Sequence, residues 1–300
     1  MALRWFYPDT PDLPLPPQHR FPADKYHLLR EAVVDRGILD AANLIPSPPA
    51  TLSELTRAHD SGYVASMLAG TVAPEIMMAI GLPWSRVLVA RSRATVGGTL
   101  AAARQALIDG VCGQLAGGTH HAHCAYGSGF CVFNDCAVAA LTLLDDGAVQ
   151  RVAILDLDVH QGDGTAAILN HERRAFTASV HGANNYPFLK ATSSLDIGLP
   201  DGTGDATYLS ACQQALDAVL AFAPGLVLYI AGADPLASDR LGRLAVTHSG
   251  LIARDLLVLQ TCRENSIPVV ILIGGGYAHP ISDTVDAYAN TFQAARDVFG

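Results

Sequence analysis

The chain has 300 residues, of which 50% are apolar and 16% are charged. This composition excludes a disordered protein and predicts a large buried core. The chain carries 19 lysines and arginines against 28 aspartates and glutamates, a formal net charge of −9. That balance argues against direct nucleic-acid binding, which depends on cationic side chains meeting phosphates.

The N-terminal half predicts an entry loop followed by helices. The first ten residues lack the apolar stretch of a secretory signal, and the apolar run 218–233 is shorter than a membrane span and broken by Pro224 and Gly225. We therefore expect a cytoplasmic protein without a membrane segment. The proline-rich segment 11–22 precedes a helical pattern at 23–35 and is expected to be an entry loop. The six cysteines form no Cys-x-x-Cys pair, which favours buried, reduced thiols.

From about residue 113, short β-branched runs alternate with longer segments of helical periodicity. One or two helices at 84–109 come before them. Strands are predicted at 113–116, 152–158, 176–180, 226–231 and 269–273, and helices at 135–144, 206–223, 247–264 and 282–298. This alternation is typical of an α/β protein with a parallel sheet. Ligands of such sheets bind at the carboxyl ends of the strands, where we therefore look for chemistry.

The strand at 152–158 leads into a cluster of acids with one histidine. Strand spacing predicts that Asp156, Asp158 and His160 share one face, because side chains alternate with a period of two. Burying these groups unpaired would be costly, and one divalent cation can satisfy an imidazole and a carboxylate together. The alternative is a solvated strand end, which the apolar run 152–155 disfavours.

Three further strand ends carry polar residues. His120 and His121 follow the first strand, and His123 beside them is expected to be structural. Asp234 follows the strand ending at 231, and Tyr277 follows three glycines after the last strand. Each of the last two ends, taken alone, is more consistent with a turn, and the histidine loop alone is a weak signal. Their convergence on one sheet edge indicates a functional site.

Three of these residues match the ligand count of a catalytic zinc, which takes three protein groups and leaves a position for water. Asp158, His160 and Asp234 supply such a set. Bound zinc lowers the pKa of its water towards neutrality and so makes hydroxide available.

The remaining polar residues fit acid–base and oxyanion roles. His120 and His121 would act as nearby bases, each needing an orienting carboxylate, for which Asp156 and Asp163 are the unassigned acids. Tyr277 is a neutral donor suited to a developing oxyanion. The combination predicts metal-assisted amide hydrolysis.

Five motifs, in this order, resemble those of the zinc-dependent histone deacetylases and their bacterial relatives. They are Gly-Gly-Thr-His-His-Ala at 117–122, Gly-Ser-Gly-Phe-Cys at 127–131, Asp-Leu-Asp-Val-His-Gln-Gly-Asp-Gly at 156–164, Gly-Ala-Asp-Pro-Leu at 232–236 and Gly-Gly-Gly-Tyr at 274–277. The resemblance spans nearly the whole chain. It implies one catalytic domain over residues 1–300, a three-layer α/β/α structure with a central, mostly parallel sheet known as the arginase/deacetylase fold.

The resemblance also implies roles for the same residues. Zinc would be held by Asp158, His160 and Asp234. His121 would be the general base and then the acid, with His120 as its electrostatic partner, while Tyr277 would polarise the scissile carbonyl. Asp156 and Asp163 would orient His120 and His121 respectively.

The resemblance also assigns residues to a substrate tunnel and to a second cation site. The acyl-lysine tunnel would be lined by Phe130 and by Tyr186 or Phe188, with the Gly129 carbonyl accepting the substrate amide proton. A monovalent cation, usually potassium, would lie beside the zinc strand. Its site would use groups from Asp156, Asp158, His160 and Ser179.

Within the family, the two segments at 156–164 and 185–204 look most like those of the class IV branch and its bacterial relatives. Asp163 departs from that branch, where asparagine is usual, which puts the tuning of His121 in question. Thr119 replaces the aromatic residue often found before the paired histidines, which bears on the pocket floor and the acyl length tolerated.

Four functions remain open on these residues. The first is a deacylase acting on acetyl-lysine or longer acyl-lysine in protein or peptide. The second is an acetylpolyamine amidohydrolase, which acidic residues at the rim would favour. The third is a non-catalytic binder of acylated ligands. The fourth, a two-manganese ureohydrolase, fits less well because Gly162 stands where a further aspartate is usual.

Overall fold

The structure is a computed structural model that describes residues 3–16 and 18–300. At its centre lies a six-stranded sheet in the order β3-β8-β7-β4-β5-β6, and every pairing in it is parallel. Its strands are β3 (Val111–Gly113), β4 (Val152–Asp156), β5 (Ala175–Gly182), β6 (Leu195–Leu199), β7 (Leu226–Ile230) and β8 (Val269–Leu272). A smaller parallel pair joins β1 (Trp5–Tyr7) to β2 (Leu44–Pro46).

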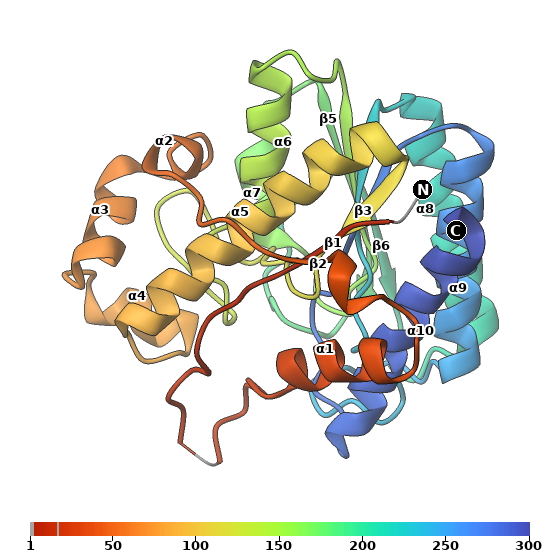
Figure 1. Cartoon of the computed structure of the whole chain (residues 1–300), viewed down its shortest axis with the longest axis horizontal. Helices are drawn as coiled ribbons and strands as arrows, with labels where there is room; N and C mark the ends of the chain where they lie inside the picture. The colour runs from red at the N-terminus through yellow and green to blue at the C-terminus, as the bar shows by residue number, and fades with distance from the viewer. Residues whose placement is uncertain (1–2, 17) are drawn as a thin grey trace.

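Helices cover both faces of the six-stranded sheet (Figure 1). One face packs against α1 (Lys25–Asp35), α8 (Asp205–Phe222), α9 (His248–Glu264) and α10 (Ile281–Phe299). The other packs against α5 (Arg86–Asp109), α6 (Asp135–Asp145) and α7 (Asp163–Leu169). Helices α2 (Leu52–Leu55), α3 (Ser61–Ala69) and α4 (Pro74–Ile80) lie farther from the sheet, and α2 and α3 contact α6 and α5 respectively (Figure 1).

Alternation along the central strands explains the two cores. Ala153 and Leu155 of β4 face the α8–α10 side, while Val152 and Ile154 face the α5–α6 side. Because both faces are covered, β4 is apolar from Val152 to Leu155 instead of alternating with polar residues. The predicted three-layer α/β/α fold with a parallel sheet is confirmed.

The predicted helices are present, and of the one or two helices expected at 84–109 the structure forms one, α5. The first predicted strand is displaced: β3 is Val111–Gly113, Gln114 forms an isolated bridge to Phe6, and residues 115–116 lie in a bend. Strand β6, the two-stranded sheet and helices α2, α3, α4 and α7 were not anticipated. Strand β6 alternates between half-buried and exposed residues and contains a glycine, so it lacks the apolar signal of its neighbours.

The described part of the proline-rich segment 11–22 contains no helix or strand, and Pro17 lies outside the described residues. Five cysteines are buried and unpaired as expected, but Cys124 is exposed because it lies in the surface turn of the 117–131 loop. No single helix in the described ranges is long and apolar enough to cross a membrane, although the bent pair α3 and α4 passes by length and composition alone.

Candidate active site

The polar residues at four strand ends converge at the carboxyl edge of the sheet. His160 Nδ1 lies 3.1 Å from Asp158 Oδ1 and 3.0 Å from Asp234 Oδ2, although Asp234 follows β7 and the other two follow β4. One ligand atom from each of the three residues lies within 4.8 Å of the others. All three side chains are buried.

This cluster fits a divalent cation by its donor chemistry. Two buried carboxylates against one imidazole leave an excess of negative charge, which is costly unless a cation neutralises it. One nitrogen and two carboxylate oxygens belong to the ligand types that zinc prefers, and three protein ligands leave a position open. Asp158, His160 and Asp234 are therefore the residues that could hold the metal.

The backbone around the cluster is shaped to hold these carboxylates. The Gly275 amide donates to Asp158 Oδ2 at 2.5 Å, and the Val159 amide donates to Asp234 Oδ1 at 2.9 Å. A Cβ atom on Gly275 would lie 2.0 Å from Asp234 Oδ2, so only glycine fits there.

The expected face-sharing along a continuous strand is wrong. Strand β4 ends at Asp156, and Asp158 and His160 lie in the bend that follows. The bend forms because Asp156 Oδ1 accepts the Asp158 amide at 3.2 Å and Asp158 Oδ1 accepts the His160 amide at 2.9 Å. These turn-type bonds, not strand alternation, aim the ligands.

Two histidines flank the cluster, each against its own carboxylate. His120 Nδ1 lies 2.7 Å from Asp156 Oδ2, and His121 Nδ1 lies 2.6 Å from Asp163 Oδ1, as the pairing predicted. The two rings are 4.2 Å apart. Burial lowers the pKa of His121 to about 4, and the charge of His120 adds to this effect. Burial also opposes charging of His120, but Asp156 and Asp158 outweigh it and raise that pKa to about 9.

A third histidine shares one of these carboxylates. His123 Nε2 lies 3.1 Å from Asp163 Oδ2, and its ring stacks on Tyr126 with centroids 4.5 Å apart. Asp163 therefore contacts a histidine with each oxygen. Sequence reasoning treated His123 as structural and did not connect it to Asp163, because the two lie on different segments.

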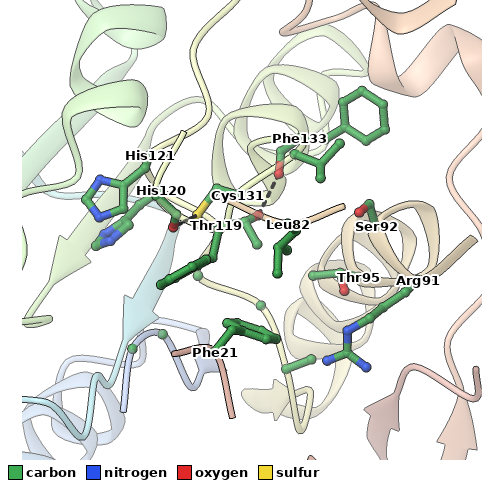
Figure 2. A pocket seen from close by; sticks show the side chains of 18 of the residues that line it. Phe21, Leu82, Arg91, Ser92, Thr95, Thr119, His120, His121, Cys131 and Phe133 are labelled. Carbon is green, nitrogen blue, oxygen red and sulfur yellow. Dashed lines mark hydrogen bonds between the residues drawn. The ribbon is translucent and has the colours of Figure 1, made fainter. Parts of the chain in front are cut away.

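Residues at the start of α6 form hydrogen bonds to the loop that carries His120 and His121. Asp135 Oδ2 accepts the Gly118 amide at 3.0 Å and Oδ1 accepts the Thr119 amide at 2.8 Å, while Asn134 Nδ2 donates to the Ala122 carbonyl at 3.0 Å. Thr119 Oγ1 donates to the Phe133 carbonyl at 2.6 Å (Figure 2). Sequence reasoning placed a helix at 135–144 but did not assign Asn134 or Asp135 to the site.

Tyr277 lies beside the cluster, with its ring 6.4 Å from that of His160. Its amide donates to Asp239 Oδ2 at 2.6 Å. Burial raises the pKa of its phenol well above the ordinary value, so the hydroxyl stays a neutral donor. Lys25 Nζ lies 5.1 Å from the Tyr277 ring centroid and 3.3 Å from the Gly276 carbonyl. Nothing in the sequence of α1 marked Lys25 as part of this site.

Two cavities meet at His160, which lines both of them, and Asp158 lines the inner one. The inner cavity has His120 and His121 on one side and Arg91, Ser92 and Thr95 of α5 on the other (Figure 2). The outer cavity, about 750 Å³, opens to solvent and reaches His121, His160 and Tyr277.

The predicted tunnel residues line the outer cavity at different depths. Gly129 and Phe130 adopt left-handed backbone conformations, with φ of 52° and 66°, at the point where the two cavities meet. The Tyr186 ring lies 4.9 Å from that of His121, and its hydroxyl bonds to Ser128 Oγ. Phe188 is 81% exposed and lies at the outer rim. Tyr186 is therefore the deeper of the two alternatives.

Ser179 lies next to Asp156 in the register of β4 and β5. Its hydroxyl bonds to His181 Nδ1 at 2.9 Å. The structure thus brings Ser179 beside Asp156 at the carboxyl end of β4.

Comparison with known proteins identifies the family. Residues 19–292 match the model of the histone deacetylase domain. The chain is 43% identical to an uncharacterized protein of Picosynechococcus sp., over 95% of this chain and 96% of that one. It is 31% identical to histone deacetylase 2 of Arabidopsis thaliana, over 89% of this chain and 73% of that one.

Solved structures agree on the fold. An HDAC homologue complexed with SAHA aligns over 99% of this chain and 84% of its own, with a TM-score of 0.83 and 23% identity. Acetylpolyamine aminohydrolase from Burkholderia pseudomallei aligns over 99% of this chain and 100% of its own, with a TM-score of 0.77 and 21% identity. The five motifs, the sheet and the domain match lead to one conclusion: the chain belongs to the histone deacetylase family of hydrolases.

Proposed function

We propose that this chain is a zinc-dependent deacylase that hydrolyses the amide of acetyl-lysine or a longer acyl-lysine. The observation that carries the proposal is the buried approach of Asp158, His160 and Asp234 to one another, with His160 lining a cavity that opens to solvent. Bound zinc would supply a water of lowered pKa and would polarise a carbonyl.

The acid–base work is assigned to His121. Its Nδ1 is engaged by Asp163, which leaves Nε2 to take a proton from the attacking water and return it to the leaving amine. His120, held by Asp156, acts on His121 electrostatically across the 4.2 Å between their rings.

Other residues position the substrate and its developing charge. Tyr277 donates its phenol proton as a hydrogen bond to the carbonyl oxygen, where negative charge grows during attack. The Gly129 carbonyl accepts the substrate amide proton, and Phe130 and Tyr186 enclose the lysine stem and exclude water. A potassium ion near Ser179, Asp156, Asp158 and His160 is part of the same proposal, on the strength of the family resemblance.

The test is turnover by zinc-loaded protein together with its metal content. Acetyl-lysine peptide, a longer acyl-lysine peptide and acetylspermidine are assayed side by side on the wild type and on Asp234→Ala. We expect the wild type to hydrolyse acyl-lysine with one zinc per chain. Asp234→Ala should lose both zinc and turnover while keeping the far-ultraviolet circular dichroism of the fold.

Stoichiometric zinc in Asp234→Ala would move the third ligand elsewhere. Binding of acyl-lysine by zinc-loaded wild type without any turnover would instead identify a non-catalytic binder. Two manganese ions per chain in elemental analysis would favour a ureohydrolase.

A further inference from the structure

The mouth of the outer cavity is basic in a chain that is acidic overall. Among the described residues that line this cavity, none is an aspartate or glutamate. The basic ones, besides His121 and His160, are His19, Arg20, Arg240 and Arg243. The chain as a whole carries −9. The rim is therefore opposite in charge to the acidic rim that an acylated polyamine would favour.

The guanidinium groups at this mouth remain available to a ligand. Arg240 uses Nε to bond the Tyr277 carbonyl at 3.2 Å, which leaves its terminal nitrogens free of that contact. Among the described residues, no carboxylate lies within ion-pair distance of Arg20 or Arg240. Arg243 Nη1 lies 3.4 Å from Asp201 Oδ2, a solvent-exposed contact of little strength.

Two of these arginines share a small hollow next to the reaction centre. It is lined by Arg20, Arg240, Leu241 and Tyr277. An anionic group in this hollow would therefore lie close to the phenol that we assign to the scissile carbonyl.

The loop that carries Arg240 and Arg243 is preorganised. Asp239 Oδ1 accepts the Leu241 and Gly242 amides, both at 2.8 Å, while its other oxygen holds the Tyr277 amide. Asn185 Nδ2 donates to the Leu241 carbonyl at 2.8 Å. A rigid loop loses little entropy on binding, so its charges act as a fixed feature of the mouth.

We propose that this mouth selects acyl-lysine flanked by acidic side chains in a peptide or protein, and that it disfavours acylated polyamines. This inference rests on the proposed deacylase function. Fixed cationic groups attract an anionic substrate and speed its encounter, while like charges reject a polycation. Phe188, exposed at the same rim, offers an apolar contact to a peptide that a polyamine would not use.

The experiment compares kcat/KM for matched acetyl-lysine peptides whose flanking residues are glutamate, glutamine or lysine, together with acetylspermidine and free acetyl-lysine. We expect the glutamate peptide to exceed the lysine peptide by about tenfold or more, with acetylspermidine lowest. Because exposed charges are screened, raising the ionic strength from about 0.05 M to about 0.5 M should shrink this preference.

Variants separate the mouth from general charge effects. Arg20→Gln and Arg243→Gln, alone and together, should bring the glutamate-to-lysine ratio towards one. Arg173→Gln is the matched control, because this exposed arginine precedes β5 at the opposite edge of the sheet, and it should leave the ratio unchanged.

Each outcome bears on one proposal. Equal turnover of the glutamate and lysine peptides, or faster turnover of acetylspermidine, would overturn the selection by charge while leaving the deacylase intact. A high rate on free acetyl-lysine but not on the glutamate peptide would place the recognised anion on a small molecule and overturn the peptide assignment. No turnover of any acyl substrate by zinc-loaded protein would remove the deacylase itself.

Discussion

A single hydroxyl, the phenol of Tyr277, is assigned to stabilise the negative charge that develops on the carbonyl oxygen. Tyr277 keeps its ring packed against Phe130 and Lys25 whether or not the oxygen is present. In Tyr277→Phe we expect kcat to fall by about 10²- to 10³-fold, as for loss of an oxyanion donor. KM should change little, because the lost bond strengthens mainly as charge develops.

The measurement is kcat and KM of zinc-loaded wild type and Tyr277→Phe on the same acyl-lysine peptide. Zinc content and melting temperature serve as controls and should match the wild type. A variant that retains full turnover would show that Tyr277 has no part in the reaction.

At the scale of elements, helix α9 is tied to the end of β7 by a buried ion pair. Arg254 Nη1 donates to the Gly232 carbonyl at 2.6 Å, and Arg254 Nη2 lies 2.8 Å from Asp255 Oδ1. Asp255 also accepts from the Tyr229 hydroxyl at 2.5 Å and from Thr291 Oγ1 at 2.7 Å. The network thus joins α9, α10 and the strand that leads to Asp234.

Breaking this pair on one side should be severe. In Arg254→Met, Asp255 remains buried without its cation, so we expect a loss of about 3–5 kcal/mol in the free energy of unfolding. Zinc affinity should fall as well, because the loop after β7 loses its anchor. Urea denaturation and zinc titration measure the two effects.

The same helix supplies the control. Arg263→Met removes an exposed arginine of α9 and should change stability by less than about 0.5 kcal/mol. The double variant Arg254→Met/Asp255→Asn should recover part of the lost stability, since no buried charge is then stranded. Equal stability of Arg254→Met and the wild type would contradict the anchoring role.

Across the whole molecule, a buried neutral histidine makes stability depend on pH. His59, just before α3, bonds through Nδ1 to the His123 carbonyl at 3.0 Å and accepts the Asn134 amide through Nε2 at 2.8 Å. Burial, more than any other influence, lowers its pKa from 6.5 to about 4. Protonation would turn the accepting nitrogen into a donor facing the Asn134 amide.

The direction of this pH dependence follows from which state, folded or unfolded, binds the proton more readily. Below about pH 6.5 the unfolded chain takes up a proton at His59 that the folded chain refuses until about pH 4. His59 therefore makes its full contribution to the free energy of unfolding above pH 6.5. That contribution falls as the pH drops to 4 and does not change further below it. The total is about 3 kcal/mol.

Denaturation of the wild type, His59→Gln and His171→Gln between pH 4 and pH 7.5 tests this. His59→Gln should be less stable at pH 7.5 but should lose less stability on acidification. His171 is exposed, so its variant should follow the wild type. Parallel pH curves for the wild type and His59→Gln would contradict the prediction.

The sequence by itself determined the class of fold and the chemical groups of the site. Strands such as β4 and β7 are formed by contiguous apolar runs. In long helices such as α5, apolar residues recur every three or four positions, so the local sequence pattern is enough to predict both kinds of element. Asp158 and His160, Asp234 and Tyr277 were identifiable because each follows a strand within a few residues. The ordered motifs tied them to one family.

Only the tertiary structure decided which distant groups meet and which surface the substrate encounters. Lys25 reaches the Gly276 carbonyl, Arg254 is buried instead of solvated, and Arg20 shares a hollow with Arg240. None of these contacts leaves a local periodic signal, and short elements such as α2 and half-exposed strands such as β6 leave a weak one. Asp158 and His160 are oriented by a bend and not by a strand. Side-chain-to-backbone hydrogen bonds end β4 at Asp156, whereas the apolar pattern of the sequence predicts a longer strand.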